Sequence, residues 1–234
     1  MTNKVFSNIP WISIASFAFF AILFIIFPNI DIWFSSLFFI KNKFIFSKNK
    51  IIKIIDYVVE YGGIALWVGF VSYLGIKDLK RNGLRDFFKP GIKRKLLYIS
   101  LVGLIGSVGF VQGIKMYTRR CRPNLVEFFG GIEKFTKVFT QNTAPIYEKC
   151  VSFVSGHSAV GFLVFSIAFL YSASDIRRKK YILIGMLVGI SFGFVRIVQG
   201  KHFISDVIFS GYVVYFTALI LNLLIKPSDK EVDL

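Results

Sequence analysis

Residues 203–225 read FISDVIFSGYVVYFTALILNLLI, a run of 23 residues in which Asp206 is the single charged side chain. A helix needs roughly 20 residues to cross about 30 Å of hydrocarbon. Hydrocarbon offers no partner to backbone N–H and C=O groups, and the run lacks the alternating polar and apolar residues of a barrel strand. The stretch is therefore predicted to be a transmembrane helix.

Five more apolar runs of similar length precede this one along the chain. We predict six spans, at about 10–28, 54–76, 96–117, 152–174, 181–199 and 203–225. Residues 1–234 are expected to form a single membrane-embedded domain of the all-α class, a polytopic six-transmembrane-helix bundle. Residues 29–53 mix Phe and Ile with Lys, and we expect them to lie along the membrane surface.

The composition agrees with a membrane protein and argues against soluble classes. Of the 234 residues 55% are hydrophobic, and Lys and Arg outnumber Asp and Glu by 29 to 13. The basic residues stand in short segments between apolar runs too long for a nucleic-acid-binding module, so nucleic acid is not an expected partner. Anionic lipid or phosphate is the expected counter-charge. Two His and two Cys are too few for a zinc site of these ligands, and no metal is expected.

The basic residues also indicate the orientation of the spans. The two densest basic runs, 77–95 and 175–180, fall on the same side of the membrane when the spans alternate in direction. Cytoplasmic segments are typically rich in Lys and Arg, so we expect both termini in the cytoplasm. The ends of the third and fifth spans and the starts of the fourth and sixth then meet on the opposite side.

Polar and ionisable residues gather at those span ends. Such residues cost free energy in or near a membrane, so they are candidates for a functional role. Arg and Lys suit phosphate oxygens, and N–H groups at the start of a helix bind anions. His202 and Asp206 stand four residues apart, so on a helix they share one face and the carboxylate holds the tautomer of the ring. This set of residues is typical of phosphoryl transfer: Lys115, Arg122, Pro123, Ser155, Gly156, His157, Arg196, His202 and Asp206.

Three segments of this set resemble the signature motifs of the type 2 phosphatidic acid phosphatase superfamily. They stand in the family's order and at the expected span ends: Lys115-x6-Arg122-Pro123, Ser155-Gly156-His157 and Arg196-x5-His202-x3-Asp206. The six-span layout is also similar to that of the family's membrane members. Val154 and Val195 depart from a pattern that commonly has Pro and Ser there, and neither change removes a catalytic group.

The resemblance implies a metal-independent phosphoric monoester hydrolase that needs no cofactor. His202 would be the nucleophile that forms a phosphohistidine, with Asp206 orienting it and stabilising its charge. His157 would act as general acid toward the departing oxygen and then as base for water. The phosphoryl oxygens would be held by Lys115, Arg122, Ser155, Gly156 and Arg196.

A narrower resemblance points to the bacterial lipid A phosphatases, most closely the 4′-phosphatases. It rests on Phe27-Pro28-Asn29-Ile30-Asp31, on Val126 and Phe129-Gly130 after Arg122-Pro123, and on Cys150 shortly before Ser155. Lipid A carries two phosphates, and Arg119 and Arg120 beside Arg122 would suit a head group with more than one anionic group. The alternative for Arg119 and Arg120 is interfacial anchoring to anionic lipid.

Two further patterns concern packing rather than chemistry. Cys121 and Cys150 share the predicted non-cytoplasmic loop, and a disulfide there would close about 30 residues, worth about 3–4 kcal/mol in the chain-entropy model. The alternative is two free, partly buried thiols. Glycines recur every four residues in the fifth span and twice in the third, where we expect them to let another helix approach closely: Gly185, Gly189, Gly193, Gly109 and Gly113.

The resemblances together imply a multi-pass protein of a bacterial inner membrane that removes a phosphate from lipid A, the 4′-phosphate rather than the 1-phosphate, with its site facing the periplasm. The rival substrates are undecaprenyl pyrophosphate, phosphatidylglycerol phosphate and phosphatidic acid. A related reaction would pass the phosphoryl group to another lipid instead of water. A rival of a different class is a transporter or channel whose basic vestibule only binds phosphate. The acyl-chain requirement and the oligomeric state stay open.

Overall fold

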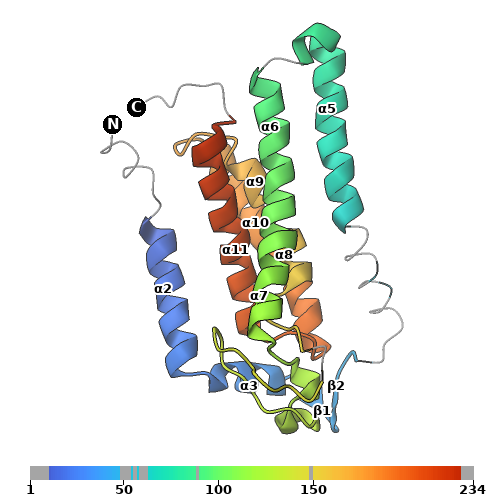
Figure 1. Cartoon of the computed structure of the whole chain (residues 1–234), viewed down its shortest axis with the longest axis vertical. Coiled ribbons are helices and arrows are strands. Elements are labelled where there is room, and N and C mark those ends of the chain that lie inside the picture. The colour runs from blue at the N-terminus through green and yellow to red at the C-terminus, as the bar shows by residue number, and fades with distance from the viewer. Residues whose placement is uncertain are drawn as a thin grey trace.

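The computed structural model describes residues 11–47, 54, 57, 63–87, 90–147 and 150–227. Its long helices run side by side, and short helices, a hairpin and loops close one end of them (Figure 1). The chain is mainly helical, as predicted. In chain order the elements are α2 (Trp11–Ile26), α3 (Asn29–Ser36), β1 (Phe39–Ile40), β2 (Lys43–Phe44), α5 (Gly63–Phe87), α6 (Pro90–Leu101), the π-helical stretch η2 (Val102–Phe110), α7 (Val111–Thr118), the 3-10 turns η3 (Pro123–Leu125) and η4 (Glu127–Phe129), α8 (Gly156–Phe162), α9 (Phe165–Ala168), α10 (Ile176–Val198) and α11 (Ile204–Ile225).

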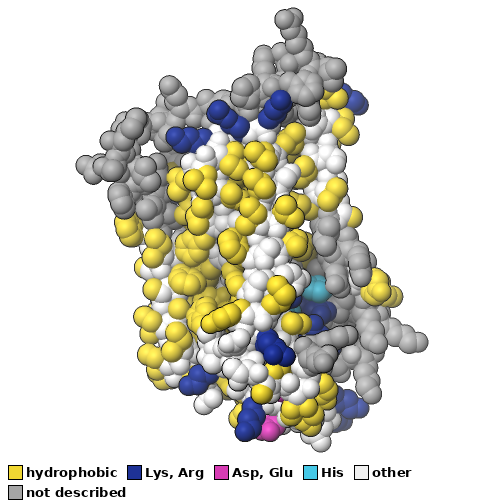
Figure 2. Space-filling view, viewed as in Figure 1, with side chains coloured by type: hydrophobic (Ala, Val, Ile, Leu, Met, Phe, Trp, Pro, Cys, Tyr) yellow, Lys and Arg dark blue, Asp and Glu magenta, His cyan; other side chains and the backbone are white. Residues whose placement is uncertain are grey.

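Three helical stretches in the described part of the chain are long and apolar enough to cross a membrane. They are Lys93–Leu125, which joins α6, η2 and α7, and then α10 and α11. A fourth is counted if α2 and α3 form one bent span. Hydrophobic side chains occupy the middle of the molecule in Figure 2, and Lys and Arg lie toward its two ends. The membrane character agrees with the sequence, and the count of six spans remains a prediction.

Two predicted spans take a form that hydropathy did not show. The predicted span 152–174 is broken into α8 and α9, and the apolar helical part, Gly156–Ala168, is shorter than a bilayer crossing. The predicted span 54–76 matches α5 only from Gly63 onward, and most of its earlier residues lie outside the described ones. α5 also continues to Phe87, because charged residues end an apolar run without ending a helix.

The chain turns by 86° between α2 and α3. Pro28 stands at this turn, where it lacks an N–H and disfavours helical geometry at the residue before it. α3 therefore crosses the end of the bundle, the orientation expected for a segment along the membrane surface (Figure 1). The hairpin of β1 and β2 follows, and Lys41 and Asn42 at its tip both have positive φ, as two-residue hairpin turns require. Residues 48–53 of this predicted segment lie outside the described ones.

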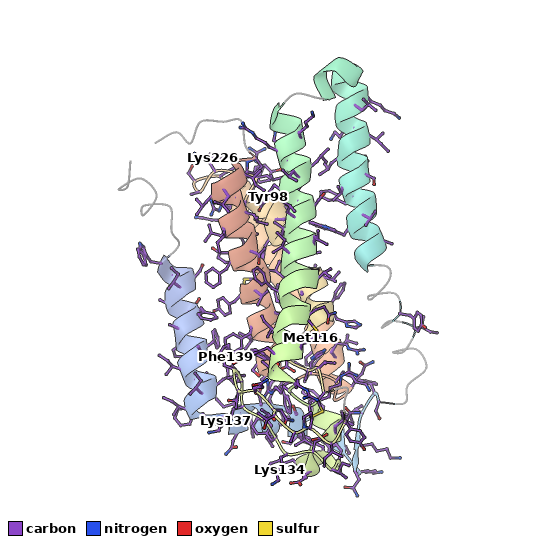
Figure 3. All side chains as sticks on the ribbon, viewed as in Figure 1. Tyr98, Met116, Lys134, Lys137, Phe139 and Lys226 are labelled. Carbon is purple, nitrogen blue, oxygen red and sulfur yellow. A yellow bond between two sulfur atoms is a disulfide. The ribbon has the colours of Figure 1, made fainter. Side chains whose placement is uncertain are left out.

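α11 lies inside the bundle, packed against α8, α10 and η2. Phe209, Val214 and Ala218 are buried on it, as the apolar sequence of this helix predicts. Lys226, just after α11, lies at the opposite end of the molecule from Lys134 and Lys137 of the loop before α8 (Figure 3). The alternating direction of the helices therefore separates these two basic regions, as expected.

Close packing of α10 against α8 depends on glycine, as predicted. A Cβ atom on Gly161 would lie 2.8 Å from the Cα of Gly189, and one on Gly189 would overlap the ring of Phe162. Real side chains do not approach this closely, so both positions need a hydrogen as side chain. For Gly109 and Gly113 the described part of the chain contradicts the prediction. Among the described residues, a Cβ on Gly113 would meet nothing within 4 Å and one on Gly109 only the carbonyl of Leu104.

Candidate active site

The predicted site residues come from the end of the bundle that α3 and the hairpin close. α7 and α10 end there, and α8 and α11 begin there (Figure 1). Arg119 reverses the chain after α7 with a left-handed backbone (φ 47°), and its N–H still donates to the carbonyl of Lys115. The N–H of Asn124 donates to the carbonyl of Gly200 at 3.0 Å. This bond fixes the segment that carries Arg122 beside the turn that carries His202.

His202 and Asp206 form the pair that their spacing predicts. His202 precedes α11, and Asp206 is the third residue of that helix. Nδ1 of His202 lies 3.3 Å from Oδ2 of Asp206, and the imidazole is buried, with 2% of the residue exposed. With Asp206 ionised, Nδ1 carries the proton and donates it to the carboxylate. Nε2 of His202 is then the nitrogen with a lone pair available for attack.

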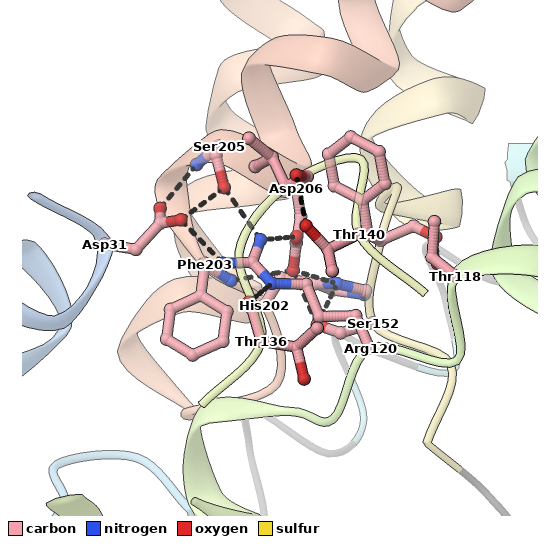
Figure 4. Close-up of polar contacts among 12 residues, drawn as sticks. Asp31, Thr118, Arg120, Thr136, Thr140, Ser152, His202, Phe203, Ser205 and Asp206 are labelled. Carbon is pink, nitrogen blue, oxygen red and sulfur yellow. Dashed lines mark hydrogen bonds and ion pairs between the residues drawn. The ribbon is translucent and has the colours of Figure 1, made fainter. Parts of the chain in front are cut away.

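Asp206 Oδ2 is held by two further donors (Figure 4). The hydroxyl of Ser152 donates to it at 2.5 Å, and the backbone N–H of Phe203 donates to it at 2.9 Å. The latter bond satisfies a backbone donor at the start of α11, as an acidic residue in the first helical turn commonly does. The carboxylate is therefore fixed by the helix that it belongs to and by the segment before α8.

Burial lowers the pKa of His202 to about 4, from an ordinary value of 6.5. The bond to Asp206 opposes this shift, and the positive charges of Lys115 and Arg196 add to it. Both cations therefore lie close enough to His202 to act on its charge. The consequence is a neutral imidazole at ordinary pH, the form that a nucleophile needs.

We expect the His202 ring to titrate near pH 4 in the protein without substrate. The chain has two His, so ¹³C-histidine NMR gives two signals, and the His157→Ala protein assigns them. Because the unfolded chain takes up this proton near pH 6.5 and the folded chain only near pH 4, the free energy of unfolding should fall as the pH falls across that window. A His202 signal that titrates at or above pH 6.5 would contradict this picture.

The start of α8 forms the other side of the site. Ser155 caps the helix, its Oγ accepting the N–H of Ser158 at 3.4 Å, and its own N–H donates to the carbonyl of Asp206 at 3.0 Å. A Cβ on Gly156 would lie 3.5 Å from Nζ of Lys115. The ammonium group of Lys115 therefore stands at the N-terminus of α8, and His157 is the second residue of this helix. Helix N–H groups and an ammonium at one place favour an anion.

The remaining predicted cations occupy the neighbouring ends. Arg196 is in the last turn of α10, largely buried, and its NH1 donates to Oε1 of Gln199 at 2.9 Å. Arg122 directly precedes the turn η3. Figure 2 shows a histidine among Lys and Arg side chains on the face in view. The structure thus supports one basic site at the junction of α7, α8, α10 and α11, and the role of each residue as a phosphate ligand remains a prediction.

The structure does not support a head-group contact for Arg120. Its side chain is fully buried, and its guanidinium group is bonded on every side. NH2 donates to Oδ2 of Asp31 and NH1 to Oδ1 of Asp206, both at 2.7 Å, and Nε donates to the carbonyl of Thr136 at 2.8 Å. A buried guanidinium must be paired with an opposite charge. Its partners here are the carboxylates of Asp31 and Asp206, which are far from it in the sequence. Arg119 is partly exposed and keeps its two alternatives.

Sequence reasoning assigned no role in the site to three residues, of which Asp31 was quoted only as part of the resemblance to the lipid A phosphatases. Asp31, on α3, accepts from the N–H of Ser205 at 3.0 Å and from its hydroxyl at 2.6 Å. Ser152 bonds to Asp206, as described above. An aspartate inside the apolar segment after the first span is costly, and this cost was the signal available for Asp31. Serines are common in membrane helices, so Ser152 and Ser205 carried no comparable signal.

Cys121 and Cys150 are joined by a disulfide, the first of the two alternatives that the sequence analysis gave. Next to the disulfide, the N–H of Ser152 donates to the carbonyl of Arg120 at 2.7 Å. The disulfide therefore helps to hold together the two segments that carry Arg120 and Ser152. Cys121, Cys150 and the buried Glu133 also bring their sulfur and carboxylate atoms within 4.8 Å of one another. This group does not fit a metal ion, because a disulfide sulfur is not the thiolate that a metal binds.

Comparison with known proteins gives two matches. Residues 96–229 match the family model described as the PAP2 superfamily. The chain is also 30% identical over 205 residues to a protein named lipid A 4′-phosphatase from Francisella tularensis subsp. novicida (strain U112), which covers 86% of this chain and 88% of that protein. No solved structure matches the chain. The family match includes all three predicted motifs and excludes Asp31.

Proposed function

Because the chain belongs to the PAP2 superfamily, we propose that it is an integral-membrane lipid phosphatase that removes a phosphate from lipid A through a covalent phosphohistidine on His202. The observation that carries the proposal is the buried His202–Asp206 pair, on which the charges of Lys115 and Arg196 both act. A neutral, oriented imidazole beside fixed cations is the arrangement that nucleophilic attack on a phosphate monoester needs.

The proposed reaction has two displacements. In the first, Nε2 of His202 attacks phosphorus, the N–P bond forms and the P–O bond to the sugar breaks, while His157 gives its proton to the departing oxygen. In the second, His157 takes a proton from water, the water oxygen bonds to phosphorus, and the N–P bond breaks. Inorganic phosphate leaves, and both imidazoles return to their starting forms.

The cations act on the charge of the transferring group. Lys115 at the start of α8 and Arg196 at the end of α10, with Arg122 and the N–H groups at Ser155 and Gly156, would hold the three equatorial oxygens. These groups stand on rigid helix ends, so little reorganisation accompanies the reaction. No step of this scheme requires a metal ion.

Lipid A is the favoured substrate because the relative that covers 86% of the chain is named a lipid A 4′-phosphatase. The 4′-phosphate is therefore preferred over the 1-phosphate. A disulfide between Cys121 and Cys150 suits an oxidising compartment, and it lies at the same end of the bundle as the site. Both observations support our proposal that the protein lies in a bacterial inner membrane with its site facing the periplasm.

We expect the purified protein in detergent to release phosphate from lipid A and to leave a product that keeps its 1-phosphate. Mass spectrometry of the products from a panel of lipid A, undecaprenyl pyrophosphate, phosphatidylglycerol phosphate and phosphatidic acid identifies the substrate, with His202→Ala protein as the control. Release from another member of the panel but not from lipid A would overturn the substrate. Phosphate appearing on a second lipid would indicate transfer, and phosphate movement across vesicles without hydrolysis would indicate a transporter.

A further inference from the structure

We propose that Asp31 is a positioning residue for the nucleophile: acting through Arg120, it fixes the direction and the charge of Asp206, and with them the tautomer and basicity of His202. The inference rests on the proposed function of His202. It assigns a role to α3, which lies outside residues 96–229 that match the family. The shape of this part of the site therefore depends on the segment before that match.

One guanidinium group joins the two carboxylates (Figure 4). Arg120 donates from NH2 to Asp31 and from NH1 to Asp206, with both distances 2.7 Å. Ser205 closes the ring of contacts, because its hydroxyl accepts from NH1 at 2.8 Å and donates to Asp31 at 2.6 Å. All four residues are at most 1% exposed. A buried, fully bonded network of this kind is rigid.

This network sets the direction in which Asp206 points. Its Oδ1 is engaged by Arg120, so Oδ2 is the oxygen that faces His202. Arg120 is itself fixed, because Nε donates to the Thr136 carbonyl and the ring of Phe203 lies 4.4 Å from Cζ. Rotation of the Asp206 carboxylate would break its short, buried ion pair with Arg120. The ion pair therefore also keeps Oδ2 in position to accept from Nδ1 of His202.

The network also sets the charge that His202 experiences. The charges that act on it directly are those of Asp206, Lys115 and Arg196. Asp206 is in turn paired with Arg120, and Arg120 with Asp31. Asp31 accepts from Arg120 and from both donors of Ser205, as an ionised carboxylate does. With Arg120 and Asp206 it therefore gives the network a net charge of −1. Without the charge of Asp31 the sum is zero, and no net negative charge remains to stabilise the imidazole when its bond to phosphorus makes it positive. The second carboxylate thus offsets the cations that bind the phosphate.

The test compares Asp31→Asn, Asp31→Glu and the control Asp175→Asn, which makes the same chemical change at the exposed ion pair with Arg177. In Asp31→Asn we expect kcat to fall by about 10- to 100-fold, with KM close to wild type. This is the size of loss known when the hydrogen-bond partner of a metal-binding His is removed, and the same orienting role is proposed here. The ¹³C-histidine signal of His202 should titrate at a lower pH than in the wild type. Asp31→Glu should restore most of the activity and the titration, and Asp175→Asn should change neither.

Two results would overturn the proposal. One is an Asp31→Asn protein with wild-type kcat. The other is an Asp31→Asn protein that loses activity while the His202 titration and tautomer stay unchanged, since that is the behaviour of a residue that only anchors α3. The NMR measurement needs no substrate, so a wild-type protein that hydrolyses nothing in the lipid panel would refute the proposed function and leave the coupling test intact.

If Asp31→Asn does not fold, Ser205→Ala decides the question. This change removes the hydroxyl between Arg120 and Asp31 but alters no charge. The proposal predicts that His202 titrates as in the wild type. It also predicts that kcat falls by less than about 10-fold, which is less than the fall expected for Asp31→Asn. A shifted titration or a complete loss of activity in folded Ser205→Ala protein would show that the hydroxyl, and not the charge of Asp31, controls the pair.

Discussion

The His202→Ala protein, purified in detergent, should release no measurable phosphate from the lipid that the wild type hydrolyses. Removing a nucleophile from a covalent mechanism costs about 10⁴-fold or more in kcat, because the remaining groups act as a unit with it. Here Lys115 and Arg196 would still bind the phosphate, so substrate binding should persist while turnover stops. A phosphate-release assay at saturating lipid, together with a binding measurement, separates the two effects.

The same protein should remain folded. Asp206 keeps its bonds to Arg120, Ser152 and the N–H of Phe203 when the imidazole is removed, so no buried charge is left without a partner. A thermal unfolding curve in the same detergent checks this. Quenching the wild type during turnover should also trap phosphate on the peptide that contains His202, and the His202→Ala protein should trap none. Retained turnover in folded His202→Ala protein, or a phosphoryl group on another residue, would refute the mechanism.

Arg120→Met should be the most destabilising of the single changes at this site. The substitution leaves two buried carboxylates, Asp31 and Asp206, without their shared cation. Breaking a buried ion pair by removing one partner typically costs about 3–5 kcal/mol, because the other charge stays buried and unpaired. We expect the free energy of unfolding to fall by that amount, with activity lost in proportion to the folded fraction or beyond it.

The matched control is Arg119→Met, which changes the neighbouring, partly exposed arginine and should alter stability by less than about 0.5 kcal/mol. The double variant Asp31→Asn with Arg120→Met restores the net charge of the network to −1. It should therefore be more stable than Arg120→Met alone, a non-additive result that only interacting residues give. Additive effects, or an Arg120→Met protein as stable as the wild type, would show that the ion pairs do not stabilise the fold.

Arg119 and Arg120 are adjacent in the sequence but differ in their surroundings, one being partly exposed and the other buried. Arg119 adopts a left-handed backbone at the end of α7, and this reversal directs Arg120 into the protein. In the sequence they form one basic cluster with Arg122, and a contact with a lipid head group is the natural interpretation of such a cluster. The backbone turn after Thr118, and not the residue type, separates a buried, ion-paired arginine from a partly exposed one.

The amino-acid sequence by itself determined the helical class, the membrane character and the pairing of His202 with Asp206. Each of these depends on local patterns: an apolar run sets a helix in hydrocarbon, and a spacing of four residues keeps His202, just before α11, within reach of Asp206 in the first turn. The position of the motifs at span ends also predicted that Lys115, Ser155, Gly156 and Arg196 would gather at one end of the bundle. Alternation of helix direction is enough to produce that result.

Only the tertiary structure decided which groups lie behind the pair and how the helices are interrupted. Asp31 meets Arg120 and Ser205 across 89 and 174 residues of chain, and hydropathy carries no information on such distances. The break between α8 and α9 likewise falls inside an apolar run, so hydropathy did not predict it. The interaction between two buried charges depends on the distance between them and on the low dielectric constant around them. That distance is set only when the helices have packed.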